Sequence, residues 1–483
     1  MLFNSYEFIF AFLPLTFFIY FFLLNKRLVI GAKGFLVFAS LFFYSWWNIL
    51  YLPIILSSML FNYVIGNSLN KKEEKNKVSK KAIVTFGIIA NISLLAYFKY
   101  MDFFITNINS VSGSELPLLE LALPLAISFF TFQQIAYLVD SYRCETNEYD
   151  FLNYALFVTF FPQLIAGPIV HHKEMMPQFA SRWNLVKRYK NIALGLFIFS
   201  IGLFKKVVIA DTFAVWATNG FDTAVTLNFL EAWATSLSYT FQLYFDFSGY
   251  TDMAIGIALL FNIKLPINFN SPYKATNIQD FWRRWHITLS RFLKDYVYIP
   301  LGGNKNGSFR TYTNLLATFI IGGLWHGAGW TFVFWGFLHG FALVIHRTWS
   351  NLGFKLWTWA GWFITFNFVN IAWVFFRAKE WDDALKVLSG MFGLSGIMLP
   401  EKFKFLNIDF IQYNEIWLSN IYADKYLILQ LFLVFCLVLF TKNSVELKNK
   451  LVFNNYTAIY MILVLISSFL HLSGVHEFLY FNF

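Results

Sequence analysis

The first 22 residues read MLFNSYEFIFAFLPLTFFIYFF, and this stretch decides the class of protein. Its only charged side chain, Glu7, precedes an uncharged run that can enter a bilayer, since one crossing takes about 20 apolar residues. The stretch has no basic start and no small-residue cleavage site. We therefore expect it to remain as a first membrane span and not to be removed as a signal peptide.

Similar apolar runs recur along the whole chain. Of its 483 residues, 58% are apolar, 22% are aromatic and 13% are charged, whereas soluble proteins are about 25% charged. A soluble fold cannot bury that much apolar surface, so we predict an all-α polytopic membrane protein with about ten to twelve crossings. The net charge of +10 would suit nucleic acid, but the Lys and Arg residues stand in short loops between apolar runs, where they set membrane orientation.

Two early basic clusters predict that orientation. The first contains Lys26, Arg27 and Lys33, and the second, residues 71–81 (KKEEKNKVSKK), has six Lys against two Glu. Both are expected in the cytoplasm, because short basic loops stay on that side. Residues 35–69 must then leave and return as two short spans, which places the N-terminus outside.

The rest of the chain alternates between apolar spans and short polar connections. Residues 82–101 are expected to cross outward, 102–118 to form an external loop, and 119–139 to return. Further spans are expected at about 313–325, 326–348, 356–376, 426–441 and 455–472. Residues 377–425 have mixed composition and should form a surface excursion. Since no repeat or long linker separates soluble parts, we interpret residues 1–483 as a single membrane domain.

Two apolar segments look unsuited to plain crossings. Residues 151–170 (FLNYALFVTFFPQLIAGPIV) have polar or basic flanks on both sides and contain Pro162 and Gly167, which predicts a re-entrant dip. Non-helical backbone at membrane depth is tolerated only where protein or a water-filled cavity surrounds it. Lys205 and Lys206 interrupt the next apolar run, which favours a broken helix.

Asp246 and Asp252 lie inside the otherwise apolar residues 229–262. An ionisable residue in such a setting is by default a functional-site hypothesis, so Asp246 is a candidate binding residue. In the alternative, these carboxylates pair with a buried Arg or cap a helix, and hold the protein together without doing chemistry.

Two of the eight histidines have unusual settings: His286 in FWRRWHITLSRF and His326 in GGLWHGAGW. The glycines around His326 are expected to leave its imidazole open to a ligand. A neutral imidazole can take a proton from a hydroxyl and return it to a leaving group, so acyl transfer is the available chemistry. The alternatives are a helix-packing histidine for His326 and a surface histidine in a basic interfacial helix for His286.

The other histidines suggest no site. We expect loop residues at His171 and His172, packing or boundary residues at His339 and His346, and boundary residues at His471 and His476. No metal site is expected, because no carboxylate and histidine cluster has ligand spacing. The chain also has no Walker loop, GxSxG elbow or dinucleotide-binding glycine motif.

Residues 268–312 form an amphipathic, basic stretch that should lie on the cytoplasmic surface. Its cationic side chains are Arg283, Arg284, Arg291, Lys294, Lys305 and Arg310. Thr276 or Asn277 can cap a helix that starts near Gln279, and Pro300 and Gly302 should end it in a loop.

Five blocks of the sequence resemble the signature blocks of the bacterial membrane-bound O-acyltransferase family. They are FFPQLIAGPIVHHKEMMPQF, GLFKKVVIAD, YFDFSGYTDMAIGIALLFNIKLPINFNSPY, NIQDFWRRWHITLSRFLKDYVYIPLGGN and LWHGAGWTFVFWGFLHG. They run in family order from about 160 to 340, and several long blocks in order are more specific than one short motif. The C-terminal FLYFNF also resembles the subgroup that modifies polysaccharides and peptidoglycan. The signature core would cover about 120–350.

The resemblance implies a ring of helices and re-entrant segments around a central tunnel. It implies that His326 is the catalytic histidine and that His286 is the second histidine of the subgroup. Candidate substrate-binding or donor-binding residues are Trp325, Arg283, Arg284, Lys294 and Asp246. The donor would be a cytoplasmic thioester, acetyl-CoA, which is a substrate and not a permanently bound cofactor. Residues 283–310 could hold its phosphates, although positive-inside orientation explains the same charges.

The implied function is O-acetylation of a cell-envelope glycan by a multi-pass protein of the bacterial cytoplasmic membrane. Peptidoglycan, modified through a periplasmic O-acetyltransferase partner, is the first choice of acceptor. An alginate-like exopolysaccharide and D-alanylation of teichoic acid are the alternatives. Outside the enzyme class, a transporter or flippase predicts inverted repeats, which we do not find. A scaffold for an envelope complex predicts that acetylation survives the loss of His326.

Overall fold

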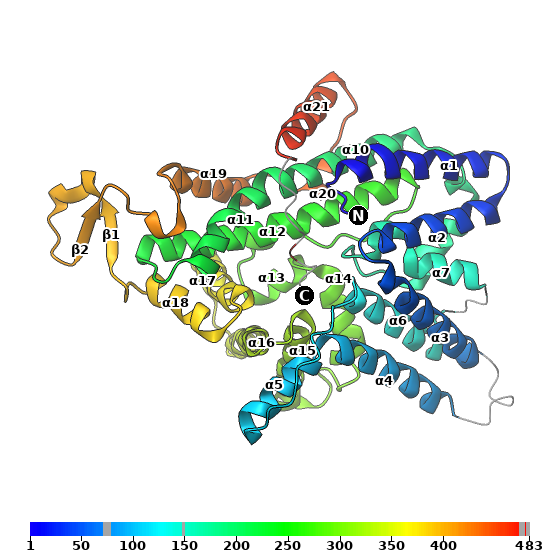
Figure 1. Ribbon diagram of the computed structural model, residues 1–483, viewed down its shortest axis with the longest axis horizontal. Coiled ribbons are helices and arrows are strands. Elements are labelled where there is room, and N and C mark those ends of the chain that lie inside the picture. Colours follow the sequence, from blue (N-terminus) through cyan, green and yellow to red (C-terminus); the bar gives the residue numbers. More distant parts are fainter. Residues whose placement is uncertain (71–78, 147–149, 473–478, 480–483) are drawn as a thin grey trace. The chain divides into compact units, whose positions relative to one another are not determined.

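The computed structural model describes residues 1–70, 79–146, 150–472 and Leu479, and this part of the chain is mainly helical (Figure 1). Predictions that concern the basic stretch at 71–78, His476 or most of FLYFNF lie outside the described residues. The described residues form two compact units: those within 1–203, 250–267 and 453–472 belong to the first, and those within 204–249 and 268–452 belong to the second. The prediction of one membrane domain stays a prediction.

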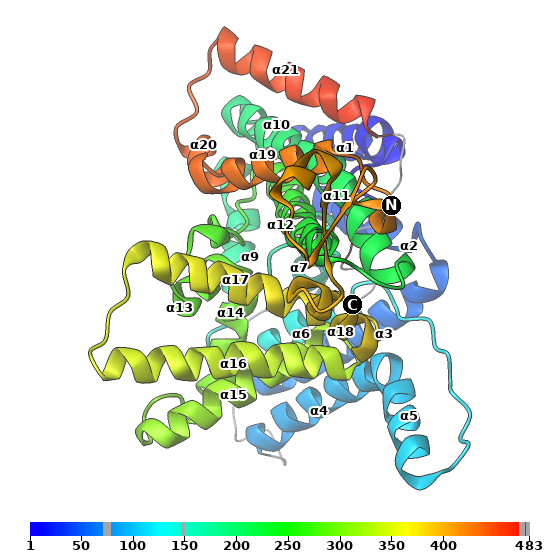
Figure 2. The ribbon, with the colours of Figure 1, turned by 90° about the vertical axis from the view of Figure 1, so that its left-hand side faces the viewer.

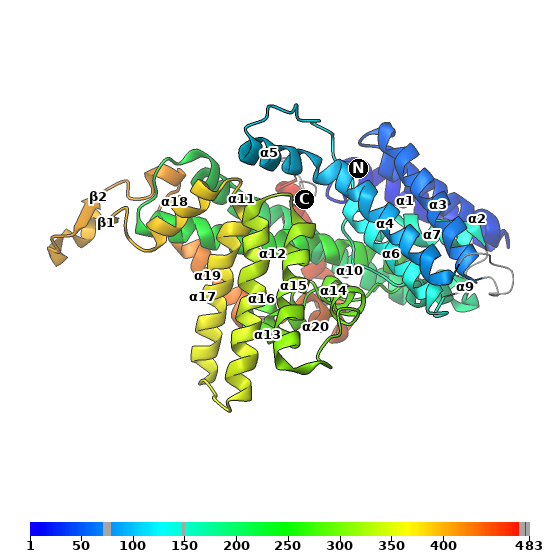
Figure 3. The same cartoon turned by 90° about the horizontal axis from the view of Figure 1, so that it is seen from below.

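The first unit is built from apolar helices, and α1 runs beside α2 while α6 packs against both α3 and α4 (Figures 1 and 3). Its elements are η1 Glu7–Phe12, α1 Leu13–Asn25, α2 Val29–Ser45, η2 Ile49–Tyr51, α3 Leu52–Asn70, α4 Lys80–Lys99, α5 Met101–Ser112, α6 Ile127–Tyr142, α7 Phe151–Thr159, α8 Phe161–Leu164, α9 His172–Ala180, η4 Arg182–Asn184, α10 Tyr189–Phe204 and α21 Asn455–Leu470. The end of the long helix α12, Phe229–Leu260, also belongs to this unit.

The second unit contains the start of α12 and three long helices, α15, α16 and α17, that lie side by side (Figures 2 and 3). Its elements are η5 Lys205–Ala210, α11 Asp211–Thr218, η6 Asn219–Thr223, η7 Pro272–Lys274, α13 Ile278–Arg284, α14 Ile287–Leu293, η8 Lys294–Tyr298, α15 Gly307–His326, α16 Trp330–Asn351, α17 Thr358–Arg377, α18 Trp381–Met391, β1 Ile397–Pro400, η9 Glu401–Leu406, β2 Ile411–Asn414, η10 Ser419–Ile421, α19 Tyr426–Phe440 and α20 Ser444–Asn449. Strands β1 and β2 pair in parallel, with Ile397 opposite Ile411.

The helices confirm the predicted class of fold. Within the described part of the chain, five helices are long and apolar enough to cross a membrane: Glu7–Asn25, Ile49–Asn70, Lys80–Lys99, Tyr189–Thr223 and Thr358–Arg377. Shorter apolar helices occupy Val29–Ser45, Tyr426–Phe440 and Asn455–Leu470. The expected ten to twelve crossings and the central tunnel stay predictions.

The two segments predicted to be unsuited to plain crossings have different outcomes. Residues 151–170 are not one helix: α7 ends at Thr159, α8 has four residues, and irregular, buried backbone follows. The expected break at Lys205 and Lys206 was wrong, because α10 continues without interruption through the π-helical η5 into α11. The helix tolerates Lys206 because two carboxylates pair with its ammonium group.

Two further expectations need correction. The predicted external loop at 102–118 contains helix α5, whose Asp102 accepts hydrogen bonds from the backbone N–H groups of Leu119 (2.7 Å) and Glu120 (3.0 Å) and so ties the returning chain to the helix start. The single interfacial helix expected from Gln279 is two short helices, α13 and α14. Asn277 does cap α13, by accepting from the N–H of Asp280 at 2.8 Å.

Candidate functional site

The two singled-out histidines lie against the same indole in the second unit. His326 is the last residue of α15, and His286 stands between α13 and α14. The ring of Trp325 lies 6.3 Å from that of His286 and 4.8 Å from that of His326, measured between centroids. The imidazoles are 0% and 3% exposed respectively. The structure therefore brings Trp325, His286 and His326 together in a water-poor setting.

Aromatic rings from two neighbouring helices hold the imidazole of His326. The ring of Trp335, from α16, meets it at 5.2 Å and 87°, and the ring of Phe376, from α17, meets it at 5.0 Å and 72°. Edge-to-face contacts of this kind favour one ring orientation. The side-chain position of His326 is thus fixed by packing on three sides.

The glycines near His326 do not leave the space that we expected. A Cβ atom at Gly323 would collide with the carbonyl oxygen of Phe332, and one at Gly327 would collide with the ring of Phe332. These two residues are small because α15 and α16 pack closely here, so the predicted open approach was wrong at Gly323 and Gly327. They allow the two helices to approach each other closely next to His326.

Hydrogen bonds fix the tautomer of His286. Its Nδ1 lies 3.0 Å from Oδ1 of Asn268, which also accepts from the backbone N–H and the hydroxyl of Thr288, at 3.2 and 3.0 Å. A backbone N–H can only donate, so the atom of Asn268 at this place is the amide oxygen. Nδ1 of His286 must then carry a proton. Burial lowers the pKa of His286 to about 3, so the ring is neutral and Nε2 has a lone pair.

The backbone at His286 is strained. Its φ angle of 43° lies in the left-handed region, which costs a residue other than glycine of order 1–3 kcal/mol. The conformation persists because Asn268 holds the imidazole, and because the Ile287 N–H bonds to the Asn268 carbonyl at 3.0 Å. Phe247 adds an edge contact at 4.8 Å. The chain thus keeps a strained turn where it positions a histidine.

We predict that Asn268→Ala lowers the rate of the expected acyl transfer about tenfold, within the roughly 10²-fold that a misplacement of about 1 Å near a reaction centre can cost. Without the amide oxygen, His286 loses the contact that fixes its tautomer and its ring plane. Thr288→Val is the matched control, because it removes one other donor to the same oxygen and should change the rate little. Acetylation is measured at matched protein level, and an unchanged rate in Asn268→Ala would contradict the role.

Asp246, a candidate substrate-binding residue, forms an ion pair with a lysine. Nζ of Lys206 lies 2.6 Å from Oδ1 of Asp246 and 2.8 Å from Oδ1 of Asp211, and all three side chains are buried. The alternative of a buried cation beside these carboxylates therefore fits Asp246, with Lys in the place of Arg. Asp246 belongs to a charge cluster, although its neighbour on α12, Phe247, contacts His286.

The basic candidates lie at or near the surface. Arg284 forms an ion pair with Asp280 at 2.9 Å and donates to the carbonyl of Asn270 at 3.3 Å. Arg283 and Lys294 are exposed. Their proposed contact with donor phosphates stays a prediction.

Among the other histidines, His339 is a packing residue, as expected. It is fully buried, and its Nδ1 accepts from Nε1 of Trp282 at 3.2 Å. His171 and His172 were expected in a loop, but both are buried at the start of α9, where His171 lies 3.3 Å from Asp140 and His172 lies 2.9 Å from the Thr146 hydroxyl. Partners more than 20 residues away replace water for these two rings.

Sequence reasoning missed Asn268 and the pairing of Lys206. Asn268 lies in the block INFNSPY. A polar amide next to apolar residues there could have indicated a buried hydrogen-bond partner. Lys206 was noticed, but only as an interruption of an apolar run.

Comparison with known proteins adds independent findings. The family model described as MBOAT, membrane-bound O-acyltransferase family, matches residues 8–379. The chain is 52% identical to the peptidoglycan O-acetyltransferase of Helicobacter pylori, over 100% of this chain and 98% of that protein. It is 39% identical to a probable alginate O-acetylase of Pseudomonas aeruginosa, over 83% of this chain and 76% of the relative. A teichoic acid D-alanyltransferase of Streptococcus thermophilus is 29% identical over 52% of this chain and 68% of the relative.

Proposed function

Because the chain belongs to the membrane-bound O-acyltransferase family and is therefore a membrane acyltransferase, we propose that it moves acetyl groups from cytoplasmic acetyl-CoA for the O-acetylation of peptidoglycan. One observation carries the chemistry: two buried imidazoles lie against the same indole, that of Trp325. The choice of acceptor is supported by the 52% identity to a peptidoglycan O-acetyltransferase along the whole chain.

In the proposed reaction His326 is the general base. It takes the proton of an acceptor hydroxyl as the oxygen attacks the carbonyl carbon of the thioester. A C–O bond forms, the C–S bond breaks, and His326 returns the proton to the departing thiolate. Because aromatic rings exclude water around this imidazole, the proton stays on the reaction path.

His286 has a positioning role in this proposal. Its Nδ1–H is engaged by Asn268, so its Nε2 can accept a hydrogen bond from a donor group of the substrate. The amide N–H groups of the pantetheine arm of acetyl-CoA are donors of this kind. No metal takes part in the proposed reaction.

The two substrates stand on opposite sides of the membrane, since acetyl-CoA is cytoplasmic and peptidoglycan lies outside. We therefore place the protein in the bacterial cytoplasmic membrane and propose that a periplasmic O-acetyltransferase partner passes the acetyl group to the sugar. Exposed Arg283 and Lys294 would meet the phosphates of the donor at the cytoplasmic face.

The test compares cells with and without the gene, at equal growth. We expect muropeptides to lose their O-acetyl groups in the deletion strain and to regain them when the wild-type chain is expressed, as measured by mass spectrometry. Membrane vesicles given acetyl-CoA labelled in the acetyl group should transfer the label to peptidoglycan. If muropeptides keep their acetyl groups while an exopolysaccharide loses them, the second candidate acceptor, suggested by the alginate O-acetylase relative, replaces the first.

A further inference from the structure

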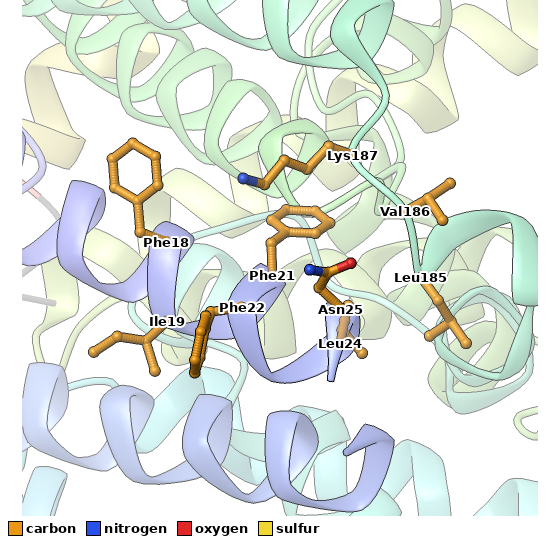
Figure 4. Close-up of a pocket in the computed structure, with 9 residues that line it drawn as sticks. All are labelled: Phe18, Ile19, Phe21, Phe22, Leu24, Asn25, Leu185, Val186 and Lys187. Carbon is orange, nitrogen blue, oxygen red and sulfur yellow. The ribbon is translucent and has the colours of Figure 1, made fainter. Parts of the chain in front are cut away.

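The first unit contains a groove that the proposed reaction does not use. It has a volume of about 760 Å³ and lies between α1 and the segment that precedes α10 (Figure 4). Its lining residues are Phe18, Ile19, Phe21, Phe22, Leu24, Asn25, Leu185, Val186 and Lys187. It is open to one side and is composed mainly of apolar side chains.

The apolar side of the groove belongs to a membrane span. Helix α1 is part of the candidate span Glu7–Asn25, and Phe18 and Phe22 on it are 61% and 59% exposed. Figure 4 shows Phe18, Ile19 and Phe22 projecting from this helix. In a bilayer these side chains meet hydrocarbon, so this part of the groove suits an acyl chain.

The other side of the groove carries one cation, Lys187, and further cations lie near it. Nζ of Lys187 lies 5.6 Å from the centroid of the Phe18 ring and 5.9 Å from that of Phe17, and Nζ of Lys26 lies 5.8 Å from that of Phe22. Residues 20–33 and 175–192 contain no acidic residue, while they contain Lys26, Arg27, Lys33, Arg182, Lys187, Arg188 and Lys190. The ammonium groups thus lie over apolar rings, in a neighbourhood that attracts an anion.

The surroundings have the composition of a membrane–water boundary. Trp183 and Tyr189, which flank the segment of Lys187, are 75% and 80% exposed. Trp and Tyr are enriched at the level of lipid head groups. Helix α10 begins at Tyr189, so the positive end of its dipole adds to the charge of Lys187.

A buried asparagine holds the cationic side in place. Asn262 is 2% exposed, and its side-chain amide donates to the carbonyls of Asn184 (3.0 Å) and Val186 (2.8 Å) while accepting from the amide of Asn191 (3.0 Å). Its φ angle of 62° is left-handed. The segment that carries Lys187 is therefore tied to the body of the unit.

We propose that this groove binds one anionic glycerophospholipid, with an acyl chain along Phe18, Ile19 and Phe22 and its phosphate beside Lys187. A neutral lipid would leave the cationic side without a counter-charge, and free phosphate would leave the apolar side uncovered. The predicted cytoplasmic position of Lys26 places the lipid in the inner leaflet, where basic pockets beside membrane helices bind acidic head groups.

The experiment uses the full chain, purified in detergent and mixed with phosphatidylglycerol or with phosphatidylcholine of the same acyl chains. Native mass spectrometry counts the lipid retained. We expect the wild type to keep phosphatidylglycerol in preference to phosphatidylcholine, and Lys187→Glu to reduce that retention at least fivefold. The matched control is Lys190→Glu, which makes the same charge change three residues later, in the first turn of α10 and outside the groove lining, and should stay within twofold of wild type. Ile19→Trp, which fills the groove, should reduce retention of both lipids.

Several results would overturn the proposal. Equal retention of the two lipids would exclude recognition of the head group, and an equal loss in Lys190→Glu would assign the effect to diffuse surface charge. Displacement of phosphatidylglycerol by the same concentration of inorganic phosphate would indicate a phosphate site. A dimer that disappears in Ile19→Trp would indicate that a second copy of the chain fills the groove. Unchanged thermal unfolding of Lys187→Glu is required, and an unfolded variant is replaced by Lys187→Gln, for which the same loss is expected.

Discussion

We expect the replacement of His326 by glutamine to abolish the proposed peptidoglycan O-acetylation while the protein accumulates at the wild-type level. The imidazole is 3% exposed and is surrounded by Trp325, Trp335 and Phe376, so no water or nearby solvent base can replace it. A positioned proton-transfer group contributes about 10² to 10⁴ in rate. We expect a loss of at least that size, because the base and the packed surroundings that orient it act together.

Glutamine is the decisive replacement because of the packing around His326. An open, glycine-lined setting would have tolerated alanine, but the ring is in contact with three aromatic side chains. Truncating a buried ring of this kind to alanine leaves a cavity and costs about 3–5 kcal/mol. Glutamine keeps much of the volume and a hydrogen-bonding end, while it cannot act as a base at neutral pH.

Muropeptide acetylation and the level of the protein are measured in the same cells. His346→Gln is the control, because His346 lies half-buried on α16 and takes no part in the proposed site. Wild-type acetylation in His326→Gln at normal protein level would end the catalytic assignment. If acetylation and protein disappear together, His326 is the helix-packing residue of the alternative interpretation.

The membrane fold was predictable because its signals are local. Long uncharged runs such as residues 8–25 need no tertiary information, and the irregular course of 151–170 follows from Pro162 and Gly167, which cannot continue a regular crossing there. The cap at Asn277 is equally local, since the side chain bonds to a backbone group three residues later. Each of these features is decided within one continuous segment of the chain.

The geometry of the site was less predictable because it depends on distant contacts. His286 adopts a left-handed conformation that no local rule predicts for histidine, and Asn268, which fixes it, is 18 residues earlier. The glycines near His326 were interpreted as open space because the sequence does not show that α16 packs against them. Family resemblance pointed to the two histidines, but it contained no information on Asn268.

Lys206→Met should destabilise the protein by about 3–5 kcal/mol, which is the usual cost of removing one partner from a buried ion pair. Lys206, Asp246 and Asp211 are 2%, 1% and 8% exposed. The ammonium group lies within 2.8 Å of both carboxylates, so its loss leaves two acids in an apolar helical environment. The fall should appear as a lower thermal unfolding temperature of the purified protein and as less protein in the membrane.

Neighbouring and compensating variants separate charge from packing. Lys205→Met makes the same chemical change at a half-buried position, where Nζ lies 3.4 Å from the Ser444 hydroxyl, and should cost about 1 kcal/mol. Adding Asp246→Asn and Asp211→Asn to Lys206→Met removes the uncompensated charges and should recover most of the lost stability, since buried ion pairs can often be replaced by neutral groups at little cost.

Equal destabilisation by both lysine variants, or no recovery in the triple variant, would contradict the charge-pairing account. If the triple variant is stable yet lacks acetylation, the cluster has a role in the reaction beyond holding the helices together.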